Sequence, residues 1–268
     1  MSQTDNDNLS RIANALDRLA PQTPDADLNT SPAYRWSEQG LEGLPVVRAQ
    51  SLDSFAAIDR QRDLFQRNLR VFADGFPAHD VLLWGARGMG KSALVRSAAE
   101  TLDLPIIEIA PSRLGQIERL FAHVGKAERR FIFFIDDFGI DERKAVHRLR
   151  SVLDGSVSGR PANIILVVTS NRRHLMEREA GAAIGDVHAR DSAHDELALA
   201  ERFGLSIGFH GASQDDYLAI CRSLATEHGI DEFAPEDALS FARQRGARSG
   251  RIAAHFITEL IGRRASST

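Results

Sequence analysis

The sequence predicts an α/β protein with a three-layer core, in which helices cover both faces of a five-stranded parallel sheet, followed by a small all-helical lid. Two observations support this fold class. Through the middle of the chain, short apolar runs alternate with helical patterns, and the central runs are continuous, as strands buried on both faces require. After residue 210 only helical patterns continue, so we expect the sheet to end there.

Composition and charge are those of an ordinary globular protein. The chain has 268 residues, with 43% hydrophobic and 26% charged, enough for one large domain or two modest ones. Its formal net charge of -4 provides no global basic field for nucleic acid. The single cysteine, Cys221, fits a reducing cytosol. We see no signal peptide and no membrane-spanning apolar run, so we expect a cytoplasmic protein without a membrane partner.

Residues 1–50 are interpreted as an N-terminal helix and a linker. The apolar positions Leu9, Ile12, Leu16 and Leu19 form one stripe of a short amphipathic helix. We expect this helix to fold back on its own domain, with binding to a partner as the alternative. Prolines between residues 21 and 32 indicate the linker.

The α/β core is predicted over residues 51–210. Its first helix carries Ile58, Phe65, Leu69 and Phe72 on one face and ends near Gly75. Predicted strands then follow at 81–84, 105–110, 131–135, 164–169 and 205–209, with helices at 91–102, 114–124 and 141–153.

The helical lid is predicted over residues 211–268. Ser213 and Asp216 have the spacing of a capping box that opens a helix. Pro235 is typical of a first helical position, and Ile252 with Phe256 indicates a third helix.

A phosphate-binding loop connects the first predicted core strand to its helix. The pattern G-x-x-x-x-G-K-[ST] is spelled by Gly85, Ala86, Arg87, Gly88, Met89, Gly90, Lys91 and Ser92. Glycines let the backbone turn and aim its N–H groups at phosphate oxygens, and the helix N-terminus adds positive charge. We expect Lys91 to reach the β- and γ-phosphates and Ser92 to ligate Mg²⁺. The alternative is a glycine-rich turn before an ordinary helix.

Polar residues follow two of the predicted strands where a ligand would lie. Asp136 and Asp137 come directly after the apolar run 131–135, and Asn171 follows the next run. Ligands bind beyond the carboxyl ends of parallel strands. Asp136 is therefore a candidate for the Mg²⁺ shell, Asp137 for general base, and Asn171 for a contact with the γ-phosphate or water. A helix cap and a turn residue are the alternative interpretations.

Together these segments resemble the AAA+ ATPases, P-loop NTPases whose Walker A loop matches residues 85–92 and whose Walker B acids match Asp136 and Asp137. The resemblance implies that Asn171 is sensor 1. Within it, the chain is most similar to a bacterial family of predicted ATPases named domain of unknown function 815. That likeness is carried by residues 85–92, 134–138, 169–175 and 202–206.

The same resemblance implies further roles outside the Walker motifs. Arg202 lies in the segment that matches the arginine finger, which acts on ATP bound to a neighbouring subunit. Arg251 matches sensor 2 in the lid, and Ile58 lies where the family contacts adenine. The resemblance therefore implies ATP and Mg²⁺ as ligands and a homo-oligomer as the active unit.

Two departures from the AAA+ pattern affect the expected activity. Asp137 stands where the family has Glu, and a side chain one methylene shorter misplaces the carboxylate. A misplacement of this kind costs about a hundredfold in rate. The segment 111–115 lacks the aromatic residue of an unfoldase pore loop, so threading of polypeptide is not supported.

The leading hypothesis is a Mg²⁺-dependent ATPase that remodels or regulates an unknown protein partner. The first alternative is a binding module whose state is switched by nucleotide binding, with little hydrolysis. It is motivated by Asp137 in the place of Glu. A DNA-linked loader or initiator is the second. Nucleic acid is not favoured, because the net charge is -4 and no appended DNA-binding motif is recognisable.

Overall fold

The computed structural model describes residues 26–45, 47, 49–139, 143–154, 159–171 and 199–265. A seven-stranded sheet with the order β2-β1-β4-β5-β6-β3-β7 forms its centre. Every neighbouring pair is parallel except β1 and β2, which are antiparallel. The strands are β1 (Ala33–Ser37), β2 (Gly40–Leu44), β3 (Val81–Gly85), β4 (Ile106–Ile109), β5 (Phe131–Ile135), β6 (Ile164–Ser170) and β7 (Leu205–Phe209).

The five predicted core strands are all present as parallel strands, which confirms the α/β fold class. Strands β3, β5 and β6 are buried along their whole length, as their continuous apolar sequences indicated. Successive residues of β5 pack into different hydrophobic clusters, because Ile132 lies on one face of the sheet and Phe133 on the other. A strand covered on both faces has no solvent-facing side, and its sequence therefore shows no polar alternation.

The sheet is larger than the five strands predicted, because β1 and β2 extend it beyond β4. Both strands lie before residue 51, in the part of the chain interpreted as helix and linker, so that interpretation was wrong for residues 33–44. Tyr34 and Trp36 are buried while the intervening Arg35 is exposed, which is the period-two pattern of a half-covered strand. Only two large residues carry this pattern, and a run that short does not stand out in the sequence.

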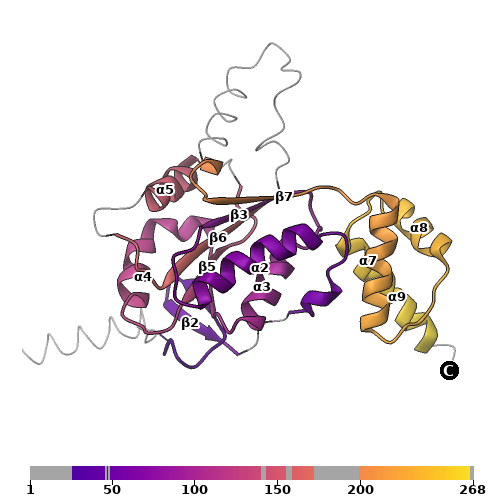
Figure 1. Ribbon diagram of the computed structural model, residues 1–268, viewed down its shortest axis with the longest axis horizontal. Helices are drawn as coiled ribbons and strands as arrows, with labels where there is room; N and C mark the ends of the chain where they lie inside the picture. Colours follow the sequence, from indigo (N-terminus) through magenta and orange to yellow (C-terminus); the bar gives the residue numbers. More distant parts are fainter. Residues whose placement is uncertain are drawn as a thin grey trace, which may run out of the picture.

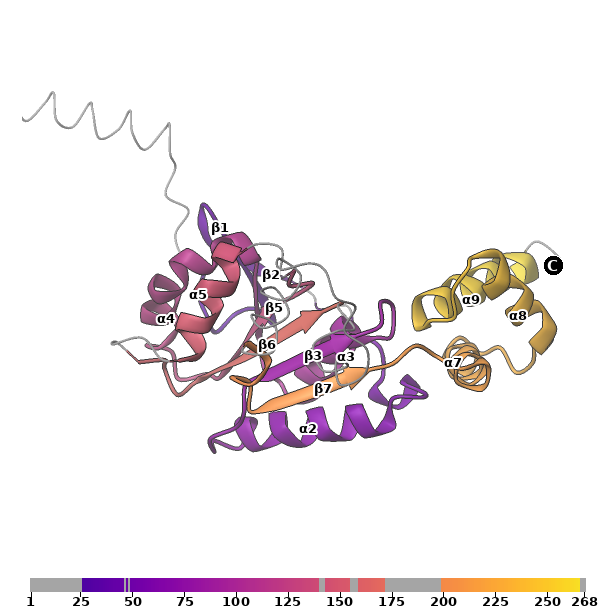
Figure 2. The same ribbon diagram turned by 90° about the horizontal axis from the view of Figure 1, so that it is seen from above.

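Helices cover both faces of the sheet, as Figures 1 and 2 show. One face carries α2 and α3, and the opposite face carries α4 and α5. Two separate buried clusters result, one on each side of the sheet. The elements of these layers are η1 (Leu52–Ser54), α2 (Asp59–Ala73), α3 (Lys91–Thr101), η2 (Pro111–Gln116), α4 (Ile117–Val124) and α5 (Arg143–Leu153).

The chain then leaves β7 for a helical lid beside the sheet (Figure 1), formed by α7 (Gln214–Glu227), α8 (Pro235–Gln244) and α9 (Gly250–Ala265). The predicted capping box opens α7: Ser213 Oγ accepts from the N–H of Asp216 at 3.1 Å, and the Asp216 carboxylate accepts from the N–H of Ser213 at 2.9 Å. Pro235 occupies the first turn of α8, as predicted. In the described part of the chain, no helix has the length and apolar character needed to span a bilayer.

Candidate nucleotide-binding site

The glycine-rich loop joins β3 to α3 at the carboxyl edge of the sheet, and it leaves no room for side chains at two glycines. Gly85 has φ 115°, and a Cβ there would lie 2.2 Å from the carbonyl oxygen of Phe209. Gly88 has φ 76°, and its Cβ would lie 2.9 Å from Ser249 Oγ in the lid. Both positions therefore need glycine, for conformation and for space. The loop is thus pressed between β7 and the lid.

Lys91 is buried below this loop, with 5% of its surface exposed. Its ammonium donates to the carbonyls of Gly85 and Ala86, both at 2.9 Å, and to Asn171 Oδ1 at 3.0 Å. Burial lowers the pKa of Lys91 to about 8, although the carboxylates of Asp137 and Asp136 oppose this shift. A buried cation with neutral acceptors around it is a favourable place for an incoming anion.

Asp136 lies at the end of β5, against the first turn of α3. Its Oδ1 accepts a hydrogen bond from Ser92 Oγ at 2.5 Å and another from Thr169 Oγ1 at 2.6 Å. Its Oδ2 lies 3.5 Å from a guanidinium nitrogen of Arg96. The two predicted metal ligands, Ser92 and Asp136, are therefore in direct contact.

Asp137 sits beside them in a left-handed backbone conformation, with φ 52°. This conformation is uncommon for residues other than glycine, although Asp tolerates it better than most. The N–H of Asp137 donates to Thr169 Oγ1 at 2.9 Å, and its Oδ1 accepts from Asn171 Nδ2. Its Oδ2 lies 3.7 Å from Arg87. The predicted base and the predicted sensor are thus hydrogen-bonded to each other.

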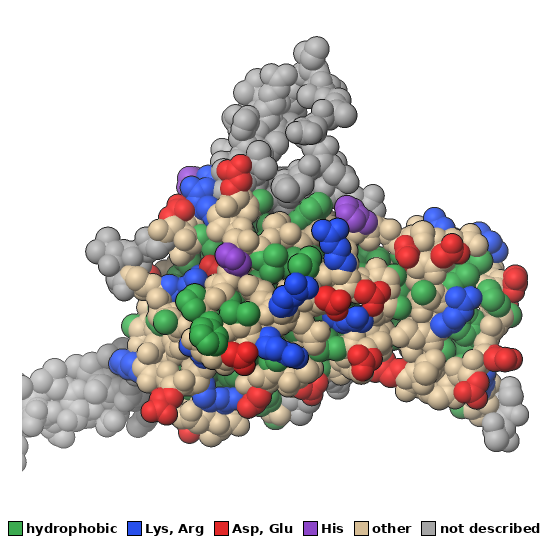
Figure 3. Space-filling view, viewed as in Figure 1, with side chains coloured by type: hydrophobic (Ala, Val, Ile, Leu, Met, Phe, Trp, Pro, Cys, Tyr) green, Lys and Arg blue, Asp and Glu red, His purple; other side chains and the backbone are tan. Residues whose placement is uncertain are grey.

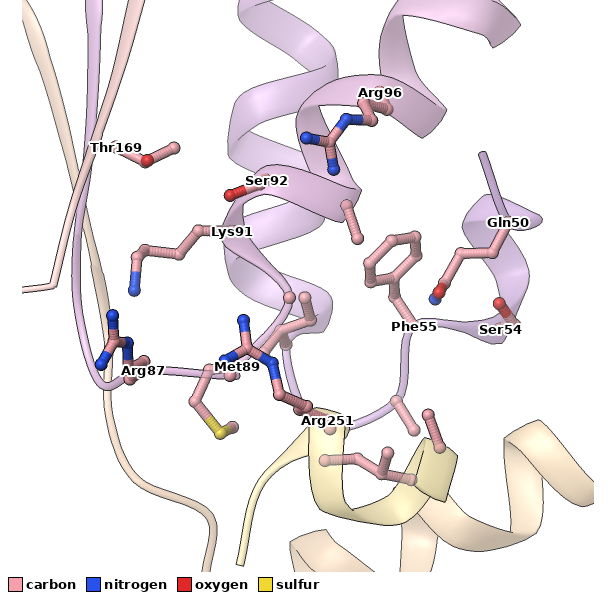
Figure 4. Close-up of a pocket in the computed structure, with 18 of the residues that line it drawn as sticks. Gln50, Ser54, Phe55, Arg87, Met89, Lys91, Ser92, Arg96, Thr169 and Arg251 are labelled. Atoms are coloured by element: carbon pink, nitrogen blue, oxygen red, sulfur yellow. The ribbon is translucent and has the colours of Figure 1, made fainter. Parts of the chain in front are cut away.

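A cavity of about 400 Å³ opens over these groups and continues to the lid (Figure 4). At one end it is lined by the phosphate-binding loop, both acids and Asn171. The rest of the lining combines apolar side chains, Phe55 and Ile58 from the core and Ile220, Leu224 and Ala254 from the lid, with the polar Gln50 and Ser54. The size and lining fit a molecule with an anionic end and a flat apolar end.

The residues at the polar end also fit a magnesium ion. Mg²⁺ prefers oxygen ligands, and proteins hold it through one or two side chains while substrate phosphates and water complete its shell. Ser92 and Asp136 supply a hydroxyl and a carboxylate oxygen. Among the described residues, no three His, Cys, Asp or Glu side chains gather into a metal site.

Sequence comparison places the chain in a family. Residues 29–264 match the family described as "Protein of unknown function (DUF815)". The chain belongs to the DUF815 family. No curated protein matches it.

Solved structures share the fold of this DUF815 protein. The Thermotoga maritima RuvB Holliday junction branch migration motor matches with a TM-score of 0.51 at 19% identity, and a point mutant of the same RuvB matches with 0.54 at 21%. Each match covers 79% of this chain and 64% of the RuvB chain, which is less than two thirds of RuvB. At this identity the likeness shows the fold, which is the P-loop fold of the AAA+ ATPases.

The lid of the DUF815 protein contributes Arg251 to the cavity. Its backbone N–H donates to the carbonyl of Gly88 at 3.1 Å, and its side chain points into the cavity (Figure 4). Ile58, the predicted adenine contact, is 4% exposed and lines the same cavity. Both residues are distant from the loop in sequence. Ile58 lies close to Gly90 on the side of the core, and Arg251 reaches Gly88 from the lid.

Of the predicted catalytic residues, Arg202 is the one that the structure does not bring to this cavity, and of the loop the cavity lining begins at Arg87. It precedes β7, whereas the cavity lies beyond the carboxyl ends of the strands, and its Nε donates to Asp154 Oδ1 at 2.6 Å. A residue that acts on a neighbouring subunit is not expected in its own cavity, so its role stays a prediction. Residues 172–175, part of the motif that resembles the family, lie outside the described residues.

Two residues that contact Asp136 were not assigned a role from the sequence. Thr169 bonds to the side chain of Asp136 and to the backbone of Asp137, and it is placed there because Val168 on β6 pairs with Ile135 on β5. Arg96 follows Ser92 by one helical turn, so the two share a side of α3. The helical spacing in the sequence was enough to predict that Arg96 lies beside Ser92. The position of Thr169 could be predicted only with the register between β5 and β6.

Proposed function

We propose that this DUF815 protein binds Mg-ATP in the cavity and hydrolyses it to remodel or regulate a protein partner. One observation carries the proposal: Ser92 Oγ lies 2.5 Å from Asp136 Oδ1 beside the buried Lys91. A hydroxyl, a carboxylate and an ammonium at the start of a helix are the groups that P-loop proteins use for a metal–triphosphate complex.

Each residue of the site has a proposed part in this activity. Lys91 and the N–H groups of the loop hold the phosphates, and Ser92 with Asp136 holds the metal. When bound, Mg²⁺ supplies positive charge that neutralises the phosphate oxygens. Asp137 accepts the proton of the attacking water, and Asn171 fixes the orientation of that carboxylate.

Two arginines extend the proposal beyond the core. Arg251 on α9 faces the cavity, where it would sense the γ-phosphate and couple it to the lid. Arg202 would reach ATP on a neighbouring subunit, which requires a homo-oligomer. Its exposed fraction of 34% is compatible with contact to a second chain.

The apolar end of the cavity supports adenine as the base. Within the described residues, the carboxylates that line the cavity are Asp136 and Asp137, both at the phosphate end. The surfaces of Phe55, Ile58 and Leu224 suit the faces of a flat base, and Gln50 and Ser54 supply polar groups for its edge. Adenine, with one exocyclic amino group, needs fewer such partners than guanine.

A protein partner is proposed rather than nucleic acid. On the face shown in Figure 3, Lys and Arg side chains are interspersed with Asp and Glu, and no broad basic surface forms there. The net charge of -4 agrees with this distribution. A salt-dependent shift of labelled DNA would redirect the proposal to a nucleic acid partner.

The test is phosphate release from Mg-ATP as a function of protein concentration, together with the binding of a fluorescent ATP analogue. We expect saturable binding, and a specific activity that rises with concentration as subunits complete one another's sites. In the Asp137→Asn variant we expect binding within about twofold of wild type and turnover reduced at least about tenfold. Absence of nucleotide binding in the wild-type protein would overturn the proposal.

A specific contact favours a second candidate, a binding module that ATP switches with little hydrolysis. Both carboxylate oxygens of Asp137 face cationic or donor groups, Asn171 on one side and Arg87 on the other. A carboxylate whose two oxygens are engaged in this way has less room to accept a hydrogen bond from the attacking water. Partner binding that depends on ATP and survives Asp137→Asn would favour the switch, whereas partner release that needs turnover would exclude it.

A further inference from the structure

Arg96 is a cation at the site that the proposed mechanism does not use. A guanidinium nitrogen lies 3.5 Å from Asp136 Oδ2, and the side chain lines the cavity. The exposed fractions are 38% for Arg96 and 27% for Asp136, so the pair is partly shielded from water. In Figure 4 the guanidinium of Arg96 lies above Ser92 on the same helix.

The arrangement follows from the spacing on α3. Ser92 and Arg96 are four residues apart and project from one side of the helix. Ser92 Oγ donates to Oδ1 of Asp136, while Arg96 faces Oδ2. Thr169 adds a second hydrogen bond to Oδ1. Both oxygens of this carboxylate are therefore engaged by the protein itself before any metal arrives.

We propose that Arg96 is an internal counter-cation for Asp136, and that it reduces the dependence of nucleotide binding on Mg²⁺. This inference rests on the proposed function of the cavity. Without a metal, a bare Asp136 carboxylate would repel the triphosphate, and the guanidinium offsets that repulsion. With a metal, the same guanidinium competes for the carboxylate. Both effects reduce the difference between the nucleotide affinity with Mg²⁺ and the nucleotide affinity without it.

A purely positioning role predicts the opposite change. If Arg96 only held Asp136 in the orientation that serves the metal, its removal would weaken binding in Mg²⁺ and leave metal-free binding unchanged. The ratio of the dissociation constant in EDTA to that in Mg²⁺ then falls. For a counter-cation the ratio rises when Arg96 is neutralised. The sign of this change separates the two roles.

The experiment measures the dissociation constant of a fluorescent ATP analogue in Mg²⁺ and in EDTA. In Arg96→Gln we expect the EDTA-to-Mg²⁺ ratio to rise by about three- to tenfold, a modest effect because the pair is partly exposed. Arg96→Lys keeps the charge and restores most of the wild-type ratio. Arg70→Gln is the matched control, since Arg70 is exposed on α2 and does not line the cavity; its ratio stays at the wild-type value.

A second background keeps the result independent of folding defects. In Asp136→Asn the carboxylate for which Arg96 and the metal compete is gone, so adding Arg96→Gln should raise the ratio by less than it does in the wild-type background. Thermal unfolding checks that each variant is folded, and if Arg96→Gln is not, the comparison uses Arg96→Met, which is also neutral. A ratio that falls or stays constant in a folded variant with a neutral side chain at position 96 overturns the proposal. Failure of wild type to bind nucleotide in either buffer overturns the proposed function itself, and this inference with it.

Discussion

The two ends of the cavity are built in different ways. At the phosphate end, Lys91, Asp136 and Asp137 are fixed by hydrogen bonds within the α/β core. At the base end, Phe55 and Ile58 of the core face side chains of the lid helix α7 across an apolar gap. The phosphate end is therefore set by the sheet, whereas the base end is formed jointly by the core and the lid. We therefore expect substitutions at the phosphate end to cause large losses of ATP affinity, and substitutions at the base end to cause small losses that affect ATP and ADP alike.

The largest expected effect comes from removing the buried ammonium. In Lys91→Met we expect the affinity for Mg-ATP to fall by about a hundredfold or more, because charge-assisted hydrogen bonds to phosphate are lost. The measurement is titration with a fluorescent ATP analogue. Lys126→Met, which removes a lysine that does not line the cavity, should bind normally. Equal affinity in Lys91→Met and wild type would mean that the phosphates bind elsewhere.

A smaller effect is expected from pH at the same end. Because the pKa of Lys91 is lowered to about 8 in the free protein, its ammonium is fully charged below that pH and is lost as pH rises through it. Bound phosphates favour the charged form, so ATP affinity should fall above pH 8 by up to about tenfold per unit, with proton uptake on binding.

The pH series needs a control for the titration of the nucleotide itself. Lys91→Met supplies it, because the phosphates still titrate in that variant while the ammonium is absent. The decline above pH 8 should disappear in Lys91→Met. If it persists there with the same slope, Lys91 is not its cause.

The smallest effect is expected at the base end. Leu224→Ala removes apolar surface from the lid side of the cavity, and we expect ATP affinity to fall by about three- to tenfold. ADP affinity should fall by the same factor, because Leu224 lies away from the phosphates. Thr226→Ala on the same helix is the control, since Thr226 is exposed and does not line the cavity. A loss confined to ATP would contradict the division of the cavity into two ends.

Local patterns in the sequence predicted much of the phosphate end. The loop from Gly85 to Ser92, the acids after β5 and Asn171 after β6 all lie where the strand pattern placed them. These features follow from backbone conformation and from the rule that parallel strands share a carboxyl edge. The partners of Asp136 were harder to predict from the sequence. The contact with Thr169 depends on the register between β5 and β6.

The edge of the sheet and the base end were decided by tertiary structure. Strands β1 and β2 join the sheet through β1, where Ala33 pairs with Ile106, more than seventy residues away in the sequence. The short run around Tyr34 and Trp36 does not predict that pairing. The predicted role of Arg202 also depends on a contact between distant parts, because the ATP that it is predicted to contact is bound to a neighbouring subunit.

By itself the sequence determined the α/β class, the phosphate-binding loop, the paired acids and the capping box that opens the lid, because each depends on residues close together in the chain. Only the tertiary structure decided which side chains meet Asp136, how the hairpin extends the sheet and how the lid closes on Gly88. Those contacts join distant segments, and they form where burial and register allow rather than where local preference points.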